Sequence, residues 1–346
     1  MMQISPETQL FIREHSSDDV RVLALQAKKY PDIDMPTAIT QIAGRKVAAE
    51  KIPSWWEIEK IWYPKHLSLE QCSSEITARY KARLLQGDSL TDLTGGFGID
   101  CSFLATGFKS ATYVERQEEL CEIAAHNFPV LNLNHINIKN EDGVTYLQAM
   151  SPVDCLFLDP ARRNEHGGKT VAISDCEPNV AELEELLLQK ANRVMIKLSP
   201  MLDLSLALKE LKQTQEVHIL SVNNECKELL ILLGQTSPTE ISIHCVNLST
   251  KGTQEEQHFV FTREQEQCSE CTYTDSLETY LYEPNASLLK AGAFRSIAAA
   301  YPVRKLHPNS HLYTSDTFIE NFPGRIFRFV NQCSFNKKEV KENLAD

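Results

Sequence analysis

The segment Leu90-Thr-Asp-Leu-Thr-Gly-Gly-Phe-Gly98 constrains the fold more than any other part of this 346-residue chain. It reads as a short apolar strand that runs directly into a glycine-rich turn ahead of a helix. Glycine tolerates a positive φ and lets a ligand approach the backbone closely. In parallel α/β sheets, ligands bind at the carboxyl ends of the strands, where such turns lie. The segment therefore predicts a site for a nucleotide-type ligand.

The order of residues within this segment narrows the class of ligand. Cys101 stands where the G-x-G-x-x-G pattern of dinucleotide-binding proteins has its third glycine, which argues against NAD. The Gly-Lys-Ser/Thr sequence that an ATP-binding P-loop requires is absent from this turn. Asp92 comes just before the glycines, where its carboxylate can neutralise the ammonium of a ligand that carries an amino acid group. A glycine-rich turn without a ligand is the alternative interpretation.

Short apolar strands alternate with helical stretches after residue 88, which predicts βαβ units and a parallel sheet covered on both faces. Five strands are expected in this order: Ser89–Leu93, Ala111–Val114, Ile136–Ile138, Val153–Leu158 and Arg193–Leu198. The clearest helices between them are Gln117–Asn127 and Pro178–Lys190. Two further apolar runs, Val217–Val222 and Leu229–Leu233, are separated by a polar link too short for a helical crossover. We expect them to form an antiparallel hairpin at the edge of the sheet.

The regions on either side of this sheet differ from it in pattern. The first 87 residues favour helices, because apolar residues recur there at three- and four-residue spacing and prolines punctuate the segment. The expected helices are Asp18–Lys29, Met35–Lys51 and Leu67–Leu85, the last with Ser68 as its cap. Residues 238–264 predict another hairpin, and Arg325–Val330 predicts a strand. The sequence thus predicts an α/β fold with a helical domain (1–87), a sheet domain (88–236) and a small C-terminal α+β region (237–346).

An acidic residue follows each of the next three strands of the predicted sheet. Glu115 ends the second strand, where a carboxylate can accept hydrogen bonds from both hydroxyls of a ribose. Asp142 follows the third strand, where it can accept a hydrogen bond from the amino group of adenine. Asp159 ends the fourth strand, in the sequence Asp-Pro-Ala-Arg162. Any one of these acids alone is typical of a turn or a cap, but their recurrence at successive strand ends favours one adenosine-containing ligand.

These features resemble the class I S-adenosylmethionine (SAM)-dependent methyltransferases, which have a Rossmann-like parallel sheet with an antiparallel edge hairpin. More closely, the chain is similar to a bacterial group of methyltransferases with a THUMP-like C-terminal domain. The similarity rests on phrases spread along most of the chain: SLEQCSSEITARYKA, DLTGGFGID, LDPARR, IKLSPMLD, NNECKELL and YEPNASLLKAGAF. THUMP domains are known for tRNA binding, so the resemblance implies an RNA substrate, either tRNA or rRNA. By the same comparison we expect the THUMP-like module to be incomplete after residue 333.

The resemblance implies a role for each residue at the strand ends. Contacts to SAM are expected from the glycine loop and the acidic positions, namely Asp92, Thr94, Gly95, Gly96, Phe97, Gly98, Glu115, Arg116, Asp142 and Gly143. Catalytic roles are expected for Asp159, Pro160 and Arg162, in a variant of the D/N-P-P-x motif beside the methyl acceptor. That motif holds an amino nitrogen in line with the methyl group. Ala161 replaces its second proline here, which weakens the case for the N6 atom of adenine as acceptor.

Other residues are candidates for closing the pocket, and a purely structural role is the alternative for each. Arg162 and Arg163 can hold a phosphate or a carboxylate near the acceptor, or pair with nearby acids. Further candidates follow the fifth strand, lie in the hairpin link or precede the sheet on a helix: Lys197, Pro200, Asn224, Glu225, Gln71, Ser73 and Glu75. Three tryptophans can either stack on bases or pack between helices: Trp55, Trp56 and Trp62.

The distribution of charge bears on the substrate. Residues 88–236 carry 12 Lys and Arg against 22 Asp and Glu, which accounts for most of the formal net charge of −12. Residues 284–330 carry six Lys and Arg against two acids, a pattern that fits either a polyanion site or a solvated surface. Together with the resemblance, this window favours methylation of a base nitrogen in RNA. A small molecule or a protein as substrate, or a non-catalytic protein that binds SAM or RNA, is the alternative.

The ten cysteines mostly lie singly within apolar segments, where Cys behaves as a small hydrophobic residue. Cys268 and Cys271 form one C-x-x-C pair, which offers too few ligands for a structural zinc site, and no metal is expected. The first residues lack the basic start and apolar run of a signal peptide. The longest apolar run, Leu229–Leu233, is too short to cross a membrane. We expect a cytoplasmic protein, and the sequence does not indicate its oligomeric state.

Overall fold

The computed structural model describes residues 4–162, 172–236, 238–250 and 256–331, together with Asn336 and Lys341. The chain divides into two compact units. The first unit comprises residues 1–214 and 230–237, and the second comprises residues 215–229 and 238–346. Within the described ranges, no helix is both long and apolar enough to span a membrane.

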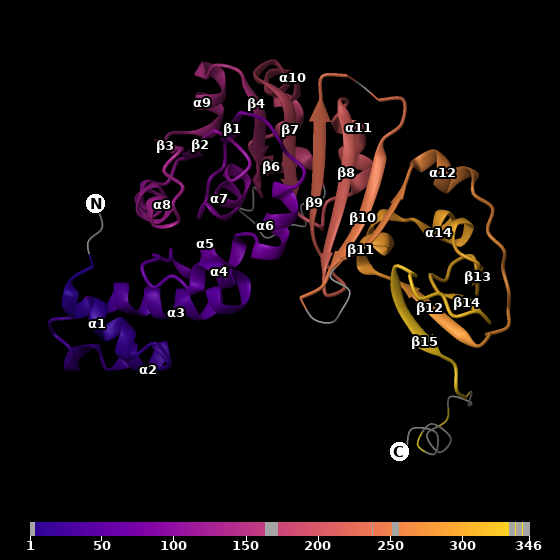
Figure 1. Ribbon diagram of the computed structural model, residues 1–346, viewed down its shortest axis with the longest axis horizontal. Coiled ribbons are helices and arrows are strands. Elements are labelled where there is room, and N and C mark those ends of the chain that lie inside the picture. The colour runs from indigo at the N-terminus through magenta and orange to yellow at the C-terminus, as the bar shows by residue number, and fades with distance from the viewer. Residues whose placement is uncertain are drawn as a thin grey trace. The chain divides into compact units, whose positions relative to one another are not determined.

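A largely parallel sheet forms the core of the first unit (Figure 1). The strands lie in the order β9-β7-β4-β1-β2-β3. Their bounds are β1 Ser89–Asp92, β2 Ser110–Glu115, β3 Ile136–Asn140, β4 Val153–Leu158, β7 Ala191–Leu198 and β9 Glu225–Gly234. Only residues 230–234 of β9 belong to this unit. The five predicted strands are confirmed, and neighbouring members of the set pair in parallel. The chain adds β2 and β3 on one side of β1, then crosses to add β4 and β7 on the other. This reversal places a crevice at the carboxyl ends of β1 and β4.

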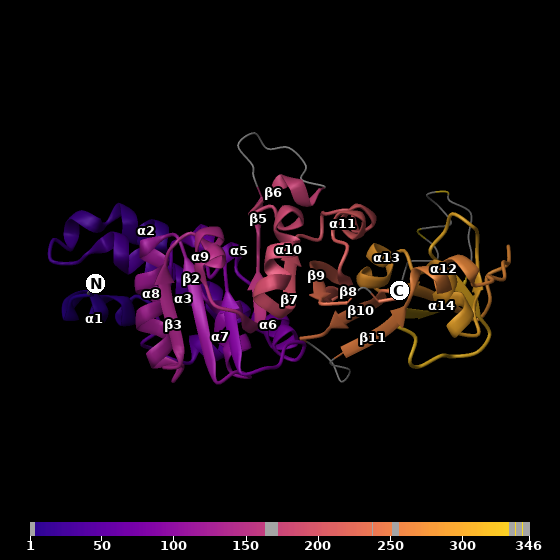
Figure 2. The same ribbon diagram turned by 90° about the horizontal axis from the view of Figure 1, so that it is seen from above.

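Helices connect successive strands of this sheet, as the alternating pattern predicts. They are α7 (Ile99–Ala105), α8 (Glu118–Val130), α9 (Gly143–Ala149), α10 (Val180–Lys190) and α11 (Leu204–Glu210). The predicted helices Gln117–Asn127 and Pro178–Lys190 correspond to α8 and α10, which begin one and two residues later. A polar side chain caps the start of α10, where Asn179 accepts a hydrogen bond from the N–H of Ala181. Helix α8 packs against β2 and β3, and α10 packs against β7 (Figure 2).

Short helices precede the sheet, at the indigo end of the chain in Figure 1. They are α1 (Pro6–Glu14), α2 (Val20–Leu25), the 3₁₀ turn η1 (Ala27–Lys29), α3 (Met35–Lys51), α4 (Pro53–Trp56), α5 (His66–Gln71) and α6 (Glu75–Ala82). The predicted helix Met35–Lys51 is confirmed at both ends. The predicted helix Asp18–Lys29 contains α2 and η1. Helix α1 is not among the predicted helices, although the Ser5 hydroxyl caps it by accepting a hydrogen bond from the N–H of Thr8.

The prediction of one continuous helix over Leu67–Leu85 is wrong. The structure has two helices, α5 and α6, separated by residues 72–74, and Ser68 lies inside α5 rather than at its cap. Serine hydroxyls compete with backbone groups for hydrogen bonds, which favours a break where two serines follow each other. The Ser73 hydroxyl is buried and donates a hydrogen bond to the carboxylate of Asp100 at 2.7 Å. The interruption therefore places a polar side chain in the interior of the unit.

An apolar cluster ties the N-terminal helices to the glycine loop after β1. Trp55 and Tyr63, together with other apolar residues of this part of the chain, are buried in one cluster with Phe97 and Ile99. The Trp55 and Phe97 rings meet edge to face, with centroids 5.2 Å apart. The side chain of Phe97 therefore anchors the loop, while its neighbouring glycines leave the backbone accessible.

The second unit contains two groups of strands. The first group consists of β8 (Thr214–Val222, with residues 215–222 in this unit), β10 (Ser242–Leu248) and β11 (Glu256–Phe261). The second group is an antiparallel sheet with the order β13-β14-β12-β15, formed by β12 Tyr280–Pro284, β13 Arg304–Lys305, β14 Tyr313–Ser315 and β15 Gly324–Arg328. Three helices belong to the same unit: α12 (Arg263–Cys268), α13 (Ala286–Ala291) and α14 (Phe294–Ala300).

The predictions for this region are confirmed except at one strand. The hairpin expected within residues 238–264 is present as β10 and β11, and the strand expected over Arg325–Val330 is β15. The prediction that β8 and β9 form the edge of the sheet is wrong, because β10 pairs in parallel with β8 along residues 216–222. Val217 and Ile219 on one face of β8 and Leu220 on the other are all buried, a pattern typical of a strand whose two faces are both covered.

Gly143 begins α9 and lies unusually close to the loop after β1. A Cβ atom at this position would be 2.2 Å from the carbonyl oxygen of Leu93. We expect Gly143→Ala to lower the free energy of unfolding by about 1–3 kcal/mol, because the two backbones must separate to admit a methyl group. Gly107→Ala is the matched control, since its Cβ would meet no atom nearer than 3.7 Å. Urea denaturation followed by circular dichroism compares them, and equal stabilities would contradict the close approach.

Candidate functional site

The carboxyl ends of the parallel strands bring the predicted site residues to one edge of the sheet. Asp92 is the last residue of β1, Glu115 is the last of β2, and Asp159 directly follows β4. Lys197 is the penultimate residue of β7. Because neighbouring parallel strands end at the same edge, these four side chains lie around the crevice beside β1.

The loop from Thr94 to Gly98 is shaped by its glycines. Gly96 and Gly98 have φ angles of +54° and +88°, in the left-handed region that favours glycine. A Cβ atom on Gly95 would come within 2.2 Å of the Tyr113 ring. The Tyr113 hydroxyl donates a hydrogen bond to the carbonyl oxygen of Gly96 at 2.5 Å. The loop is therefore held against β2 and presents backbone rather than side chains at three of its positions.

Asp92 is almost fully buried, with 1% of its surface exposed. Its Oδ1 atom accepts hydrogen bonds from the N–H and the hydroxyl of Thr94, at 2.9 and 3.5 Å. Its Oδ2 atom is also buried and has no hydrogen-bond partner among the residues that the structure describes. Burial raises the pKa of this carboxyl well above its ordinary value, and the negative charges of Asp100, Asp159 and Glu115 raise it further. A buried acceptor without a partner is unfavourable, so this oxygen suits a ligand that brings a cation or a donor.

Glu115 is buried at the end of β2 and holds two backbone groups. Its carboxylate accepts hydrogen bonds from the N–H of Gly96 at 2.9 Å and from the N–H of Gln117 at 2.8 Å. Each carboxylate oxygen has a second acceptor position, so the group can still receive the hydroxyls of a ribose. Arg116, the next residue, is exposed and forms an ion pair with Glu177 at 3.1 Å.

Asp142 serves as the cap of helix α9. Its Oδ1 atom accepts hydrogen bonds from the N–H groups of Val144 and Thr145, at 3.0 and 2.9 Å. The side chain is exposed, and the cap leaves its Oδ2 atom available to a ligand. The close approach of Gly143 to the backbone of Leu93 holds this cap beside the loop that follows β1.

Asp159 and Lys197 form a short ion pair at the ends of β4 and β7. The Nζ atom of Lys197 lies 2.5 Å from the Oδ2 atom of Asp159. The N–H of Asp159 donates a hydrogen bond to the Thr94 hydroxyl at 2.6 Å, which joins this residue to the glycine loop. Burial raises the pKa of the Asp159 carboxyl, while the charge of Lys197 opposes the rise. The side chain is still 37% exposed, so its carboxylate can reach a ligand in the crevice, whereas the adjacent Pro160 is buried.

Asp100, in the first turn of α7, forms a buried network that joins this ion pair to the N-terminal helices. Lys81 of α6 has no exposed surface, and its Nζ atom lies 3.0 Å from the Oδ1 atom of Asp100. The Oδ2 atom accepts a hydrogen bond from the Ser73 hydroxyl at 2.7 Å and lies 3.4 Å from Lys197. Burial raises the pKa of Asp100, but the two lysines outweigh this effect and hold the pKa at about 2. An ionised Asp100 is therefore linked through Lys197 to Asp159.

The residues of this network come from phrases that also carry the family resemblance. Those phrases are SLEQCSSEITARYKA, which contains Ser73 and Lys81, DLTGGFGID with Asp100, LDPARR with Asp159 and IKLSPMLD with Lys197. Lys81 and Asp100 are absent from the predicted site. A Lys in a helical stretch and an Asp in a first helical turn are each typical of an ordinary exposed helix, so their types alone do not predict burial.

The other predicted pocket residues are less closely tied to the crevice. Arg162 has a described backbone in the two-residue strand β5 (Ala161–Arg162), which pairs with β6 (Cys176–Glu177). The side chain of Arg162 and the whole of Arg163 lie outside the described residues. Of the remaining candidates, Pro200 after β7 is half-buried and Gln71 is exposed. Glu75 is buried and forms an ion pair with Arg79 at 2.6 Å. Asn224 and Glu225 belong to the second unit.

The three tryptophans divide between packing and exposure. Trp55 lies in the buried cluster around Phe97. Trp62 stacks on His126, with ring centroids 3.7 Å apart. Trp56 is 41% exposed and lies beneath the guanidinium of Arg45, at 5.6 Å from the ring centroid. Packing between elements therefore accounts for Trp55 and Trp62.

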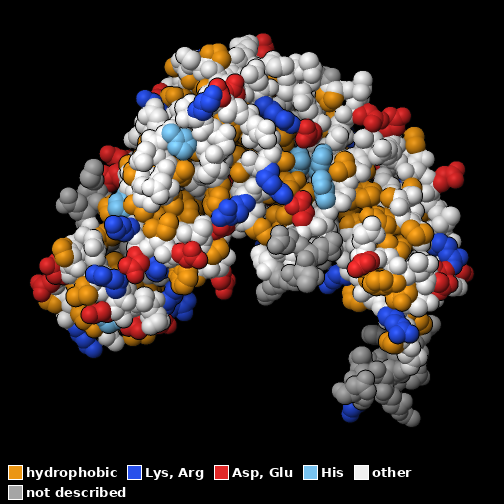
Figure 3. Space-filling view, viewed as in Figure 1, with side chains coloured by type: hydrophobic (Ala, Val, Ile, Leu, Met, Phe, Trp, Pro, Cys, Tyr) orange, Lys and Arg blue, Asp and Glu red, His pale blue; other side chains and the backbone are white. Residues whose placement is uncertain are grey.

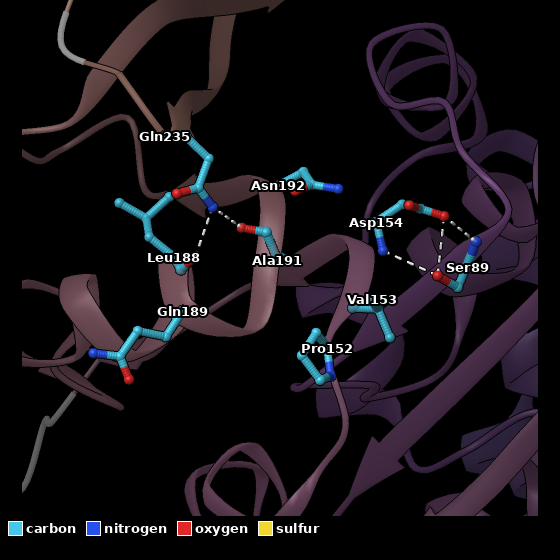
Figure 4. Close-up of a pocket in the computed structure, with 9 residues that line it drawn as sticks. All are labelled: Ser89, Pro152, Val153, Asp154, Leu188, Gln189, Ala191, Asn192 and Gln235. Atoms are coloured by element: carbon cyan, nitrogen blue, oxygen red, sulfur yellow. Dashed lines mark hydrogen bonds between the residues drawn. The ribbon is translucent and has the colours of Figure 1, made fainter.

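A small cavity lies at the opposite edge of the same sheet (Figure 4). It measures about 230 Å³ and is lined by residues at the amino ends of β1, β4 and β7, among them Ser89, Val153 and Ala191. Asp154 in its wall accepts hydrogen bonds from the N–H and the hydroxyl of Ser89 at 2.9 and 3.0 Å. Ligands of parallel α/β sheets bind at the carboxyl ends, so this cavity is not a candidate for the site.

The basic residues of the window 284–330 are partly neutralised within the second unit. Arg304 forms an ion pair with Glu278, and Arg325 forms one with Glu283 at 2.5 Å. Both glutamates lie outside the window. The local positive charge is therefore smaller than the count from the sequence indicates.

The buried network predicts a large effect on stability. We expect Asp100→Asn to lower the free energy of unfolding by about 3–5 kcal/mol at pH 7, because the buried charge of Lys81 loses its counter-charge. Asp88→Asn is the control: its ion pair with Lys109 is mostly exposed, and such pairs contribute about 0–1 kcal/mol. Urea denaturation at pH 7 measures both.

The same variant predicts a change in pH dependence. The folded-state pKa of Asp100, about 2, lies below that of an unfolded Asp, so the ionised group stabilises the protein at neutral pH and loses this contribution as the pH falls towards 2. Asp100→Asn should flatten that part of the stability profile. An unchanged profile, or equal losses in the Asp88 and Asp100 variants, would contradict the network.

The chain is similar along nearly its whole length to one solved structure. A crystal structure from Porphyromonas gingivalis W83, provisionally named as a methyltransferase, matches 99% of this chain with a TM-score of 0.85. The sequence identity is 34%, and 86% of the Porphyromonas chain is covered. A family model described as a ferredoxin-like domain matches residues 280–323, which include β12, β13 and β14. The comparison with curated proteins gave no match.

Two weaker likenesses cover about half of the chain. An rRNA methylase from Streptococcus thermophilus has 14% identity and a TM-score of 0.33, covering 46% of this chain and 93% of that one. A structure from Streptococcus mutans, provisionally named as a methyltransferase and in complex with SAH, has 14% identity and a TM-score of 0.34, covering 46% and 96%. At TM-scores below 0.5, neither likeness bears on function.

The predicted fold class is confirmed: an α/β protein with a Rossmann-like methyltransferase sheet, N-terminal helices and a smaller C-terminal α+β region. The identity of 34% is measured over an alignment that covers 99% of this chain. The chain therefore belongs to the same family as the Porphyromonas gingivalis protein, one of methyltransferase-like fold with a ferredoxin-like domain towards the C-terminus.

Proposed function

We propose that this protein is a SAM-dependent methyltransferase that modifies a base nitrogen of RNA. The unpartnered Oδ2 atom of Asp92 carries the cofactor assignment. A buried carboxylate needs a cation or a donor beside it, and the ammonium of the methionine part of SAM is both. The Asp92 carboxylate thus lacks a positively charged partner, which the ammonium group of SAM would supply.

The other strand ends fit the remaining parts of SAM. The positive φ angles of Gly96 and Gly98 shape a turn along which the methionine part can lie against backbone groups. Glu115 retains acceptor positions for the ribose hydroxyls, and Asp142 retains an oxygen for the adenine amino group. Three successive strands thereby offer acceptors in the order in which methionine, ribose and adenine are joined.

The acceptor side of the crevice suits a nitrogen nucleophile. When bound, SAM supplies an electrophilic methyl group. A base nitrogen that receives it must direct its lone pair at the methyl and release a proton. The Asp159 carboxylate is partly exposed and can accept a hydrogen bond from such an N–H, which orients the lone pair and receives the proton. Lys197 holds the Oδ2 atom of Asp159 and favours its ionised form, while the bond from the Asp159 N–H to Thr94 fixes its distance from the glycine loop.

An RNA substrate is supported by the second unit as well as by the resemblance to THUMP-like proteins. Phe327 of β15 is 45% exposed, and the Arg325 guanidinium lies 5.8 Å from the centroid of its ring. An exposed ring beside an arginine is a surface on which nucleic-acid bases stack. This surface of β15 would thus let the protein that carries the crevice bind an RNA substrate directly.

A small-molecule or protein acceptor is the second candidate. Two observations favour it: Ala161 takes the place of the second proline in the D-P-P-x motif, and Arg304 and Arg325 are already paired with glutamates. A non-catalytic SAM-binding protein is the third candidate, but it would not need the ion pair between Asp159 and Lys197 at the mouth of the crevice.

The cofactor assignment predicts a specific loss of affinity. We expect Asp92→Asn to weaken binding of S-adenosylhomocysteine about 10–100-fold, since a charge-assisted hydrogen bond contributes about 1.5–3 kcal/mol. Glu115→Gln should weaken binding as well, because one charged acceptor of the ribose becomes neutral. Asp88→Asn, at the opposite end of β1, should leave the affinity unchanged. Isothermal titration calorimetry measures all three, with circular dichroism to establish folding, and wild-type affinity in both site variants would remove the assignment.

The catalytic assignment predicts a variant that loses methyl transfer but still binds the cofactor. Purified protein is incubated with methyl-labelled SAM and with RNA, protein and metabolite fractions from cells that lack the gene. We expect label in an RNA fraction, and we expect Asp159→Asn to reduce transfer by about a hundredfold or more while the affinity for S-adenosylhomocysteine is retained. Because the carboxylate is the reactive form, wild-type transfer should also fall as the pH drops through the raised pKa of Asp159.

The fraction that carries the label decides between the candidates. Label in protein or in metabolites would favour the second candidate and exclude RNA. Full transfer by Asp159→Asn would remove Asp159 from the acceptor site. Cofactor binding without label in any fraction would favour the non-catalytic protein.

A further inference from the structure

Four residues with metal-binding side chains meet on one face of the strands β8, β10 and β11 in the second unit. Glu216 and His218 come from β8, His244 from β10 and His258 from β11. Figure 3 shows histidine side chains, in pale blue, gathered at the surface over these strands. None of the four takes part in the proposed methyl transfer.

The register of the strands brings these residues together. His218 and His244 are directly opposite each other in the parallel pair of β8 and β10. Glu216 precedes His218 by two residues, so the two side chains lie on the same face of β8. His258 lies two residues from Val260, the partner of His244 in β11, and is therefore on that face as well.

The donor atoms lie at distances that suit a single cation. One donor atom from each of Glu216, His218 and His244 lies within 4.8 Å of the other two. The Oε2 atom of Glu216 is 3.3 Å from the Nε2 atom of His218. Ligands about 2.0–2.2 Å from a tetrahedral zinc ion are about 3.3–3.6 Å from one another. The three side chains are therefore close enough to share one ion, once the two stacked imidazole rings turn so that a nitrogen of each faces it.

The imidazole rings are held in position by one another. The His218 ring stacks on the His244 ring, with centroids 4.3 Å apart and planes inclined by 16°. The Nδ1 atom of His244 lies 3.1 Å from the Nε2 atom of His258, a contact of the kind that orients metal-bound histidines. His218 is 2% exposed, whereas Glu216 and His244 are half-buried, so the cluster extends from the interior to the surface.

We propose that Glu216, His218 and His244 bind one divalent cation of the zinc class, and that His258 orients His244. Two imidazole nitrogens with one carboxylate suit Zn²⁺ and related ions, whereas Mg²⁺ and Ca²⁺ prefer sets of oxygen ligands. Three protein ligands leave the fourth position of a tetrahedral site open to water. The ion would join β8 to β10 and stabilise the second unit. In the described part of the chain, no other three His, Cys, Asp or Glu side chains come together in this way.

Titration with Co²⁺ tests the site directly. The full chain, prepared without a polyhistidine tag and freed of metal with a chelator, is titrated while its visible absorption is recorded. Tetrahedral Co²⁺ absorbs far more strongly than the hydrated ion, so the spectrum reports coordination as well as binding. We expect about one Co²⁺ per chain, displaced by an equal amount of Zn²⁺. Zn²⁺ should also raise the melting temperature, because it binds the folded state.

Variants locate the ion within the protein. Glu216→Gln and His244→Gln change partly exposed positions and should weaken Co²⁺ binding about a hundredfold or more, whereas His258→Gln should weaken it about 10–100-fold. His307→Gln is the control for an exposed histidine of the same unit and should bind Co²⁺ like the wild type. A double variant, Cys268→Ser with Cys271→Ser, tests the C-x-x-C pair, whose thiols are free.

Three results would overturn the proposal. The first is the absence of a tetrahedral Co²⁺ spectrum at a ratio near one. The second is wild-type affinity in folded Glu216→Gln and His244→Gln. The third is loss of Co²⁺ binding in the cysteine double variant alone, which would place the ion at the C-x-x-C pair. Binding of S-adenosylhomocysteine is measured independently, so either proposal can fail without the other.

Discussion

The candidate site depends on the ion pair between Lys81 and Asp100. Lys81 has no exposed surface, so its charge requires a partner inside the protein. Asp100 is that partner, and its carboxylate also accepts a hydrogen bond from the Ser73 hydroxyl and forms an ion pair with Lys197. Because these residues come from α6, α7 and β7 and from the break before α6, the pair determines where the N-terminal helices meet the end of the sheet. The glycine loop lies directly before α7 and is positioned by the same contact.

The acidic side chains around the crevice differ in whether they have a cationic partner, and a ligand could supply the one that is missing. Lys81 and Lys197 are both engaged by Asp100, and Lys197 is shared with Asp159. The Oδ2 atom of Asp92, by contrast, is buried without a hydrogen-bond partner among the described residues. A cationic group at the end of β1 would complete the set. The lysines therefore neutralise the side of the crevice where we propose the methyl acceptor, whereas the side where we propose the cofactor lacks a cation of its own among the described residues.

Much of the first unit is predictable, because its signals are local. Apolar strands of four to eight residues, capped helices and the glycine turn each depend on neighbours in the chain, and Met35–Lys51 and the five parallel strands are confirmed. The errors have tertiary causes. Leu67–Leu85 has a helical pattern, but Ser73 turns inward to reach Asp100. The hairpin of β8 and β9 reads as an edge until β10, from a later segment, pairs with β8.

The sequence by itself determined the α/β class, the succession of strands and helices along the chain and the acids at the strand ends, since strand direction alone brings Asp92, Glu115 and Asp159 to one edge. Only the tertiary structure decided which charges are buried together. Lys81, Asp100 and Lys197 belong to separate segments, as do His218, His244 and His258, and residue type does not reveal which polar side chains turn inward. Burial depends on contacts between distant segments. It is burial that requires a partner for the charge of Lys81, and that makes the Oδ2 atom of Asp92 and the group of imidazoles the places where we propose a ligand and an ion.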